Sequence, residues 1–176
     1  EVLAGQQKAQ AERISALRRD ERALLDLIES LRDIFADIPD QLDGAQPFAQ
    51  RRGQLAAPVP GRVLTGFAGT LPDGRRSEGW LLEAAAGETV RAVAPGRVAF
   101  SDWMNGYGLL LILDHGEGFL SLYAHNDGLL GEVGDWVKAG EPIAQAGSSG
   151  GQGRAAVYFE LRRQSQPLDP RVWVRR

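Results

Sequence analysis

The sequence predicts a mainly β domain that follows a long α-helix, because its two halves differ in glycine content and in the spacing of apolar residues. All but three of the 22 glycines follow residue 60, where short β-rich runs alternate with glycine turns. Before residue 40, apolar residues recur every three or four positions, which is the period of an α-helix. We therefore expect a helical segment at 1–39, a linker at 40–56 and a β domain at 57–176.

Composition narrows the range of functions. The chain has 176 residues, of which 43% are hydrophobic and 24% charged, enough for one domain and an appendage. Its net charge of −3 lacks the basic excess that nucleic-acid binding needs, so no nucleic-acid partner is expected. It contains no cysteine, which excludes disulfides and cysteine catalysis, and no run of 18 apolar residues that would span a membrane. Because the first residue is Glu1, we expect a fragment of a longer protein.

A heptad seam of apolar residues runs along the predicted helix. Its positions follow a 3-4 spacing and are Ile14, Leu17, Glu21, Leu24, Ile28, Leu31, Phe35 and Ile38. Only Glu21 interrupts the seam. Three further apolar residues widen it in the second half: Leu25, Leu27 and Ile34. Pro39 disfavours helical geometry before it, so the helix should end at residue 38. We expect residues 10–22 to be the end of a coiled coil, and the segment from Leu24 onward to pack on something broader than one helix.

Residues 40–60 read as a linker, in which Pro58 and Pro60 favour an extended approach to the first strand. Beyond it we expect eight strands, at 62–67, 80–84, 89–92, 96–103, 109–114, 119–124, 142–146 and 155–163. Hairpin turns are expected at Tyr107-Gly108 and Glu117-Gly118, because glycine favours turns between strands. Segments 87–92 and 134–139 resemble each other, as two corners of one sheet or barrel would.

Two segments of the chain resemble the metal-binding motifs of a known peptidase family, but other residues stand at the positions of the metal ligands. Residues 156–162 read Ala-Val-Tyr-Phe-Glu-Leu-Arg and resemble the His-x-His-Phe-Glu-Ile-Arg strand of the LytM/lysostaphin-type metallopeptidases. Residues 77–81 read Ser-Glu-Gly-Trp-Leu, where that family has His-x-Gly-x-Asp. The positions of the metal ligands and of one base are thus filled by Ser77, Leu81, Ala156 and Tyr158. Zinc needs about four N, S or O ligands, and leucine and alanine supply none. The resemblance therefore implies the family's fold without a metal, a cofactor or a catalytic residue.

The likeness continues in order through residues 92–98, 113–116, 122–125, 134–144 and 147–150, so it spans about 57–176. Within the family the chain most resembles the EnvC-type murein hydrolase activators, on residues 102–103, 106–109, 121–123 and 158–163. This resemblance implies a LytM-like (duplicated-hybrid-motif-like) sheet domain in the periplasm of a Gram-negative bacterium. It also implies a protein that binds N-acetylmuramoyl-L-alanine amidases and switches them on for cell division without cutting peptidoglycan. Its coiled coil would reach a division-site membrane complex.

We expect the former metal cleft to form a partner-binding groove. Its expected members are Glu78, Trp80, Tyr107, His125, Ser149, Tyr158 and Arg162. Tyrosine, tryptophan and arginine are favoured in interface hot spots. Tyr158 fits two roles equally, a groove residue or a plug of the vacated volume, and Arg162 favours the groove because an arginine is hard to bury without a partner. His125, at the position of a catalytic histidine, is expected to line the groove or to be a structural remnant. Glu78 is acidic where several relatives are expected to be basic or neutral, and it would oppose an acidic partner.

The predicted helix is itself a candidate ligand for this groove. Leu24, Ile28, Leu31 and Phe35 share one apolar face. A linker of about 20 residues reaches roughly 25 Å, enough to return the helix to the β domain. Held there at about millimolar effective concentration, it would mask the groove in the helix-in-groove mode. We therefore expect an autoinhibitory helix.

Three other functions fit parts of the sequence. A non-catalytic peptidoglycan-binding module would use the same cleft for the ancestral substrate. The two similar corners beside a coiled coil also occur in the lipoyl-like domains of efflux adaptors, although the hairpin lysine of such domains is missing. An active peptidase with unusual ligands fits least well.

Overall fold

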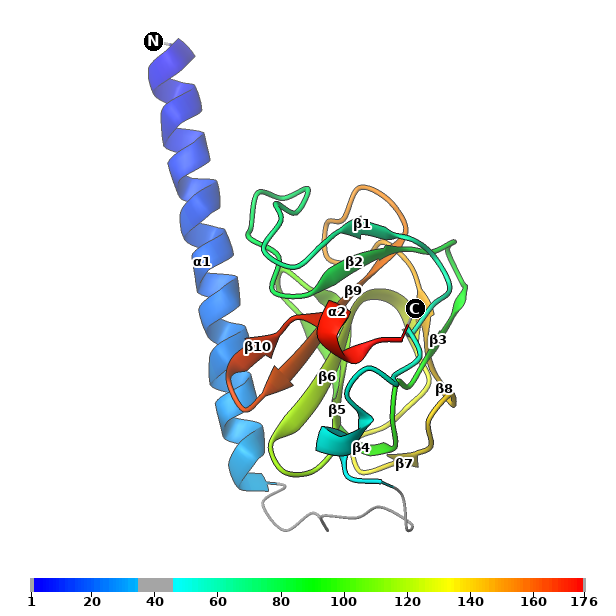
Figure 1. Ribbon diagram of the computed structural model, residues 1–176. Coiled ribbons are helices and arrows are strands. Elements are labelled where there is room, and N and C mark those ends of the chain that lie inside the picture. Colours follow the sequence, from blue (N-terminus) through cyan, green and yellow to red (C-terminus); the bar gives the residue numbers. More distant parts are fainter. Residues whose placement is uncertain (1, 35–45, 176) are drawn as a thin grey trace.

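The structure, a computed structural model, describes residues 2–34 and 46–175 (Figure 1). It consists of a long helix, α1 (Val2–Ile34), beside a β domain. Residues 35–45 lie outside the described residues. This range includes Phe35 and the expected end of the helix before Pro39, together with the first part of the expected linker. Within the described ranges, no helix combines the length and the apolarity that crossing a membrane requires.

The sequence predicts a mainly β domain, and the structure confirms it as a ten-stranded sheet whose named strands pair antiparallel. Seven strands lie in the spatial order β1 (Val63–Thr65), β2 (Trp80–Glu83), β9 (Ala156–Arg163), β6 (Phe119–Leu129), β5 (Gly108–Asp114), β4 (Gly96–Met104) and β7 (Trp136–Val137). The others are β10 (Gln166–Leu168), which pairs with β9, and β3 (Thr89–Arg91), which pairs with β8 (Pro142–Ala146). Each expected strand overlaps an observed one. The sequence does not predict β7 and β10, which have only two and three residues.

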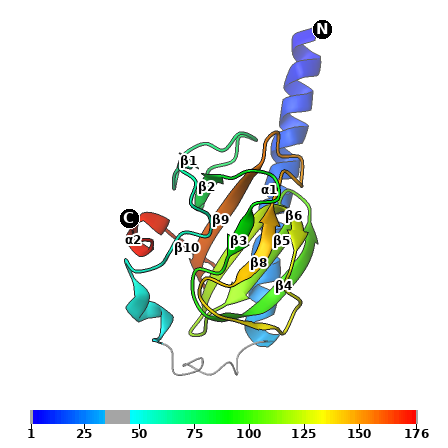
Figure 2. The same cartoon turned by 90° about the vertical axis from the view of Figure 1, so that its right-hand side faces the viewer.

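The main sheet separates two apolar clusters. Successive side chains of a strand point to opposite faces, so Val157 and Phe159 of β9 enter the first cluster while Ala156 and Tyr158 enter the second. The first cluster is closed by β3 and β8, and the second by α1. Figure 2 shows the sheet between these two coverings, with α1 behind it. The fold therefore places the helix on the face that carries Tyr158.

Helix α1 is anchored through its second half. Leu24, Ile28 and Leu31 are buried to 1%, 2% and 5% exposure against sheet residues such as Ile112. Burying one such side chain stabilises the packed state by about 1.5–3 kcal/mol. Ile14, on the same seam, is 44% exposed. The helix therefore packs on the β domain mainly between residues 24 and 31.

Part of the expected linker packs into the β domain. A 3-10 helix, η1 (Phe48–Arg51), buries Phe48, whose ring stacks on His115 at 4.8 Å and on Trp173 at 5.2 Å between centroids. Leu55 is also buried in this first cluster. Trp173 ends a short helix, α2 (Pro170–Trp173), that the sequence does not predict. The packed domain thus begins at Phe48 rather than at residue 57, because these apolar side chains are covered by the C-terminal turn.

Candidate functional site

The former metal positions are lined by hydrocarbon and by polar groups that are already engaged. β2 and β9 pair so that Leu81 lies opposite Tyr158, and both belong with Ala156 to the second cluster. Leu81 and Ala156 offer no donor atom for a metal. Ser77 is fully buried, and its hydroxyl donates to the Gly79 carbonyl at 2.7 Å. The chemistry of this set does not fit the zinc ion that the peptidase resemblance implies.

Tyr158 is the remaining candidate ligand, and its surroundings keep it neutral. Its hydroxyl accepts a hydrogen bond of 3.0 Å from the Glu78 amide. Burial, together with the negative charge of Glu160, raises the pKa of the Tyr158 phenol well above its usual range. Metal ligands bind in deprotonated form, so a phenol held neutral is a poor one. In the described ranges, no group of three or more His, Cys, Asp or Glu side chains is arranged to hold a metal ion.

Three rings come together where β5, β6 and β9 meet. The Tyr158 ring centroid lies 6.5 Å from that of Tyr107 and 6.4 Å from that of His125. Tyr107 and Tyr158 are 3% and 4% exposed, and they share the second cluster with Leu24 of α1. The expected groove residues Tyr107, His125 and Tyr158 are therefore neighbours, and in this structure the helix covers both tyrosines.

His125 is held in place through Ser149. Its Nδ1 donates to the Ser149 carbonyl at 2.7 Å, and its backbone has a left-handed φ of 66°. The Ser149 hydroxyl in turn accepts from the Leu109 amide at 3.0 Å and donates to the Asn126 carbonyl. Burial lowers the pKa of His125, so the imidazole is neutral at pH 7. Ser149 thus positions His125, and its hydroxyl is occupied by the backbone.

Glu160 and Arg162 form a buried ion pair on the same face as Tyr158. Arg162 Nε lies 2.6 Å from Glu160 Oε1, and the two side chains are 5% and 2% exposed. Arg162 Nη1 also donates to the Ser165 carbonyl at 2.8 Å. The expectation that a buried Arg162 calls for an external partner is therefore corrected, because the arginine finds its counter-charge two residues away on β9.

Trp80 does not belong to this surface. It is 4% exposed and lies in the first cluster, on the opposite side of the sheet from Leu81 and Tyr158. Neighbouring residues of a strand point to opposite faces, so Trp80 cannot line the cleft that Leu81 lines. The expectation that Trp80 is a groove residue is wrong for this reason.

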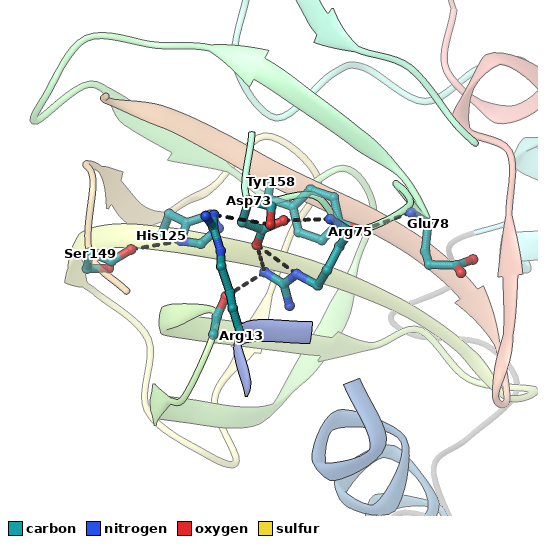
Figure 3. A network of polar contacts seen from close by, with 8 residues as sticks. Arg13, Asp73, Arg75, Glu78, His125, Ser149 and Tyr158 are labelled. Carbon is teal, nitrogen blue, oxygen red and sulfur yellow. Dashed lines mark hydrogen bonds and ion pairs between the residues drawn. The ribbon is translucent and has the colours of Figure 1, made fainter. Parts of the chain in front are cut away.

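Arg75, which no sequence pattern singles out, is central to the site. Arg75 is 6% exposed, donates from Nε to Asp73 at 2.8 Å and from Nη2 to the Gly106 carbonyl at 2.8 Å, and stacks over the Tyr107 ring. Figure 3 shows Arg75 facing Asp73 beside Tyr158, with Arg13 of α1 reaching the same turn through the Asp73 carbonyl at 3.2 Å. The only sequence signal was the position of Arg75, two residues before Ser77.

Of the hollows that α1 helps to line, two lie against the site residues. The smaller, of about 150 Å³, is lined by Glu78, Tyr158 and Arg162 from the β domain and by Glu21 and Leu24 from the helix. The larger, of about 470 Å³, is lined by His125 and the glycine-rich loop at 150–153, and by Arg13 and Leu17 of the helix. The helix therefore fits the sheet closely at Leu24 and less closely toward its N-terminus.

Comparison with known proteins agrees with this geometry. Residues 75–170, more than half of the chain, match the model of peptidase family M23. The murein hydrolase activator EnvC of Escherichia coli is 46% identical over 125 residues, which are 71% of this chain and 30% of that protein. The outer membrane antigenic lipoprotein B of Haemophilus influenzae is 39% identical over 114 residues, or 64% of this chain and 27% of that protein. The chain thus spans less than a third of the length of either relative.

A solved structure shares the fold. The putative peptidase M23 from Pseudomonas aeruginosa aligns with a TM-score of 0.68 and 22% identity, covering 90% of this chain and 61% of that chain. The fold is therefore that of the LytM-type peptidases. The sheet, the order of the motifs and the family match agree, and the chain belongs to peptidase family M23.

Proposed function

We propose that this chain is a non-catalytic activator that binds a periplasmic N-acetylmuramoyl-L-alanine amidase and switches it on for septal peptidoglycan splitting. The relative with 46% identity is named a murein hydrolase activator, which supports the general role. The choice of an amidase as the hydrolase, and of the Gram-negative periplasm as the compartment, rests on the resemblance of the motif segments. A coiled coil including residues 10–22 would connect the protein to the division-site membrane complex.

The donor set supports the absence of catalysis. Leu81 and Ala156 supply no ligand, and the Tyr158 phenol is held neutral. His125 is a buried neutral imidazole, and a general base alone contributes only about 10²–10⁴-fold even in a complete site. The family's metal chemistry is thus replaced by a surface of two tyrosines and a buried ion pair.

The observation that carries the proposal is that α1 lies on this surface as a helical ligand would. Leu24, Ile28 and Leu31 present one apolar face to the cluster that contains Tyr107 and Tyr158. Amphipathic helices commonly bind by laying such a face into an apolar groove. We propose that the amidase presents a helix of its own to this surface.

The same contact makes α1 an autoinhibitory element in our proposal. A tethered helix competes at about millimolar effective concentration, which masks a partner of micromolar affinity. Phe35, the fourth residue of the proposed autoinhibitory face, lies outside the described residues. Activation then requires that the second half of α1 leaves the sheet.

Dye release from labelled sacculi tests this function. A purified periplasmic amidase is mixed with the wild-type chain, or with a Leu24→Ala, Ile28→Ala chain in which the grip of the helix is weakened. We expect little release from either protein alone and strong release from the amidase with the weakened chain. Release by the chain alone would show that it is a hydrolase, and no release from any mixture would contradict activation.

The larger hollow favours a second candidate function, binding of peptidoglycan itself. His125 and the glycine-rich loop at 150–153 line this hollow, whose volume of about 470 Å³ would accommodate a peptide strand. Pelleting of the chain with purified sacculi in the absence of any amidase tests this alternative. Binding to sacculi without activation of an amidase would favour it over the activator role.

A further inference from the structure

Arg75 is a buried arginine with one hydrogen-bond donor left unpaired. Its Nε and Nη2 are taken up by Asp73 and by the Gly106 carbonyl, and its guanidinium lies 4.6 Å from the Tyr107 ring centroid. Its Nη1 is buried and has no hydrogen-bond partner in the described part of the chain. Buried polar groups nearly always have a partner, so Nη1 is a donor that a further group at this surface can engage.

Arg75 borders the cavity of about 150 Å³ beneath α1. Six charged side chains line it: Glu21, Arg75, Arg76, Glu78, Glu160 and Arg162. Glu160 is already neutralised by Arg162 at 2.6 Å. The volume is about ten times the minimum that holds one water molecule, so a carboxylate fits beside Arg75.

Helix α1 places the carboxylate of Glu21 at this cavity, but Glu21 and Arg75 form no ion pair. Glu21, the one interruption of the apolar seam, precedes Leu24 by three residues and lines the same cavity as Arg75. The ion-pair partner of Arg75 is Asp73 rather than Glu21. Burial raises the pKa of Glu21; Arg75 opposes this rise, and the charges of Glu78, Asp73 and Glu160 add to it. The masked state therefore holds a partly buried carboxylate that lacks an ion-pair partner among the described residues.

We propose that Arg75 receives a carboxylate from the docking helix of the partner, and that Glu21 stands in its place without making the bond while α1 masks the surface. This inference rests on the proposed function. It defines the partner's helix as one with Asp or Glu followed by apolar residues three, seven and ten positions later, the spacing from Glu21 to Leu24, Ile28 and Leu31. A charge-assisted hydrogen bond to Nη1 is then an interaction that the partner makes and α1 does not, which helps the partner displace a tethered helix.

The test measures the dissociation constant of a purified periplasmic amidase for the full chain carrying Leu24→Ala and Ile28→Ala. Adding Arg75→Met, which keeps the length of the side chain, should weaken binding about 30-fold or more, as loss of one member of a buried charge pair does. Asp73→Asn is the matched control, because it disturbs the same turn while keeping the guanidinium. It should change binding by no more than about fivefold. Arg163→Met, an exposed arginine on the other face of β9, controls for the loss of one positive charge.

A double-mutant cycle identifies the partner group. Each Asp and Glu of the amidase is replaced in turn by Asn or Gln, and each variant is titrated against the parent chain and against the chain that also carries Arg75→Met. We expect one replacement that weakens binding to the parent chain and has no further effect once Arg75 has been replaced. Two results would overturn the proposed contact between Arg75 and a partner carboxylate: no carboxylate couples to Arg75, or Asp73→Asn weakens binding as much as Arg75→Met. Either result would leave the proposed activation of the amidase intact. If the amidase does not bind the parent chain at all, the proposed function falls as well.

Discussion

Leu81 and Tyr158 lie directly opposite each other in the pairing of β2 with β9. In the metallopeptidases that the chain resembles, these two positions carry zinc ligands. Here a hydrocarbon side chain and a neutral phenol occupy them, and both pack in the cluster that α1 covers. The pair is therefore part of an apolar surface that α1 covers.

Restoring the ligands should restore zinc binding. The triple variant Ser77→His, Leu81→Asp, Tyr158→His supplies the three donors that the family motif provides, and zinc is held by such N and O ligands. We expect about one zinc per chain in the triple variant after dialysis, measured by elemental analysis, and none in the wild-type chain. Ser77→His alone is the control and should stay metal-free. One zinc per wild-type chain would show that the ligand assignment is wrong.

Weakening the grip of the helix should unmask the surface. Leu24 is 1% exposed, and a buried Leu→Ala change costs about 2–5 kcal/mol of packing free energy. Because this residue joins α1 to the sheet, most of the loss falls on docking of the helix. We expect Leu24→Ala to lower the amidase concentration needed for half-maximal dye release at least several-fold. Ile14→Ala, on the exposed part of the same seam, should leave it unchanged.

Removing one partner of the buried ion pair on β9 should lower the free energy of unfolding. Replacing Glu160 by Gln or Arg162 by Met leaves one buried charge without its partner, which destabilises a protein by about 3–5 kcal/mol. The double variant should be more stable than either single variant, as measured by urea denaturation. Arg163→Met should change the free energy of unfolding by no more than about 1 kcal/mol, because that side chain is exposed and loses only its cation–π contact with the Phe119 ring at 5.0 Å. Additive losses in the double variant would contradict the pairing.

His115 should make the fold sensitive to mild acid. Its Nδ1 lies 2.7 Å from the Pro95 carbonyl and its Nε2 2.7 Å from the Ser121 hydroxyl, and burial lowers its pKa to about 4. The unfolded chain takes up this proton near pH 6.5 and the folded chain only near pH 4. Stability therefore falls as the pH drops through this window, by about 3 kcal/mol in total. Denaturation of wild-type and His115→Asn chains at pH 7 and pH 4.5 should show a smaller loss in the variant, and equal losses would contradict the assignment.

The pattern of the sheet is accessible from the sequence because alternation along strands is a local property. The motif strand at 156–163 and its apolar alternation predict β9 and the face that carries Tyr158. The same alternation, applied to residues 80 and 81, places Trp80 on the opposite side of the sheet from Leu81. Trp80 adjoins the motif residues along the chain, but strand alternation separates it from their face.

Contacts between distant segments are not accessible in this way. Phe48 is buried because Trp173, more than 120 positions away, stacks on it at 5.2 Å. Arg75 matters because the turn that carries it meets the Gly106 carbonyl on another hairpin. Neither partner can be read from spacing or composition, since both depend on how the sheet closes.

A disulfide that locks α1 onto the sheet tests masking of the surface, and no native cysteine can compete with the engineered pair. A Cβ placed on Gly106 would lie 2.9 Å from the Asp20 Cβ, so Asp20→Cys with Gly106→Cys needs a shift of about 1 Å to form a disulfide. Gly106 also has a left-handed φ of 84°, so the unoxidised double-cysteine chain is compared with the Gly106→Cys single variant to separate backbone strain from the lock. With both cysteines placed in the Leu24→Ala, Ile28→Ala chain and with amidase and labelled sacculi present, we expect no dye release by the oxidised chain and strong release after reduction. The Leu24→Ala, Ile28→Ala chain without cysteines should be unaffected by reductant. Equal activation by the locked and the reduced chain would contradict masking by α1.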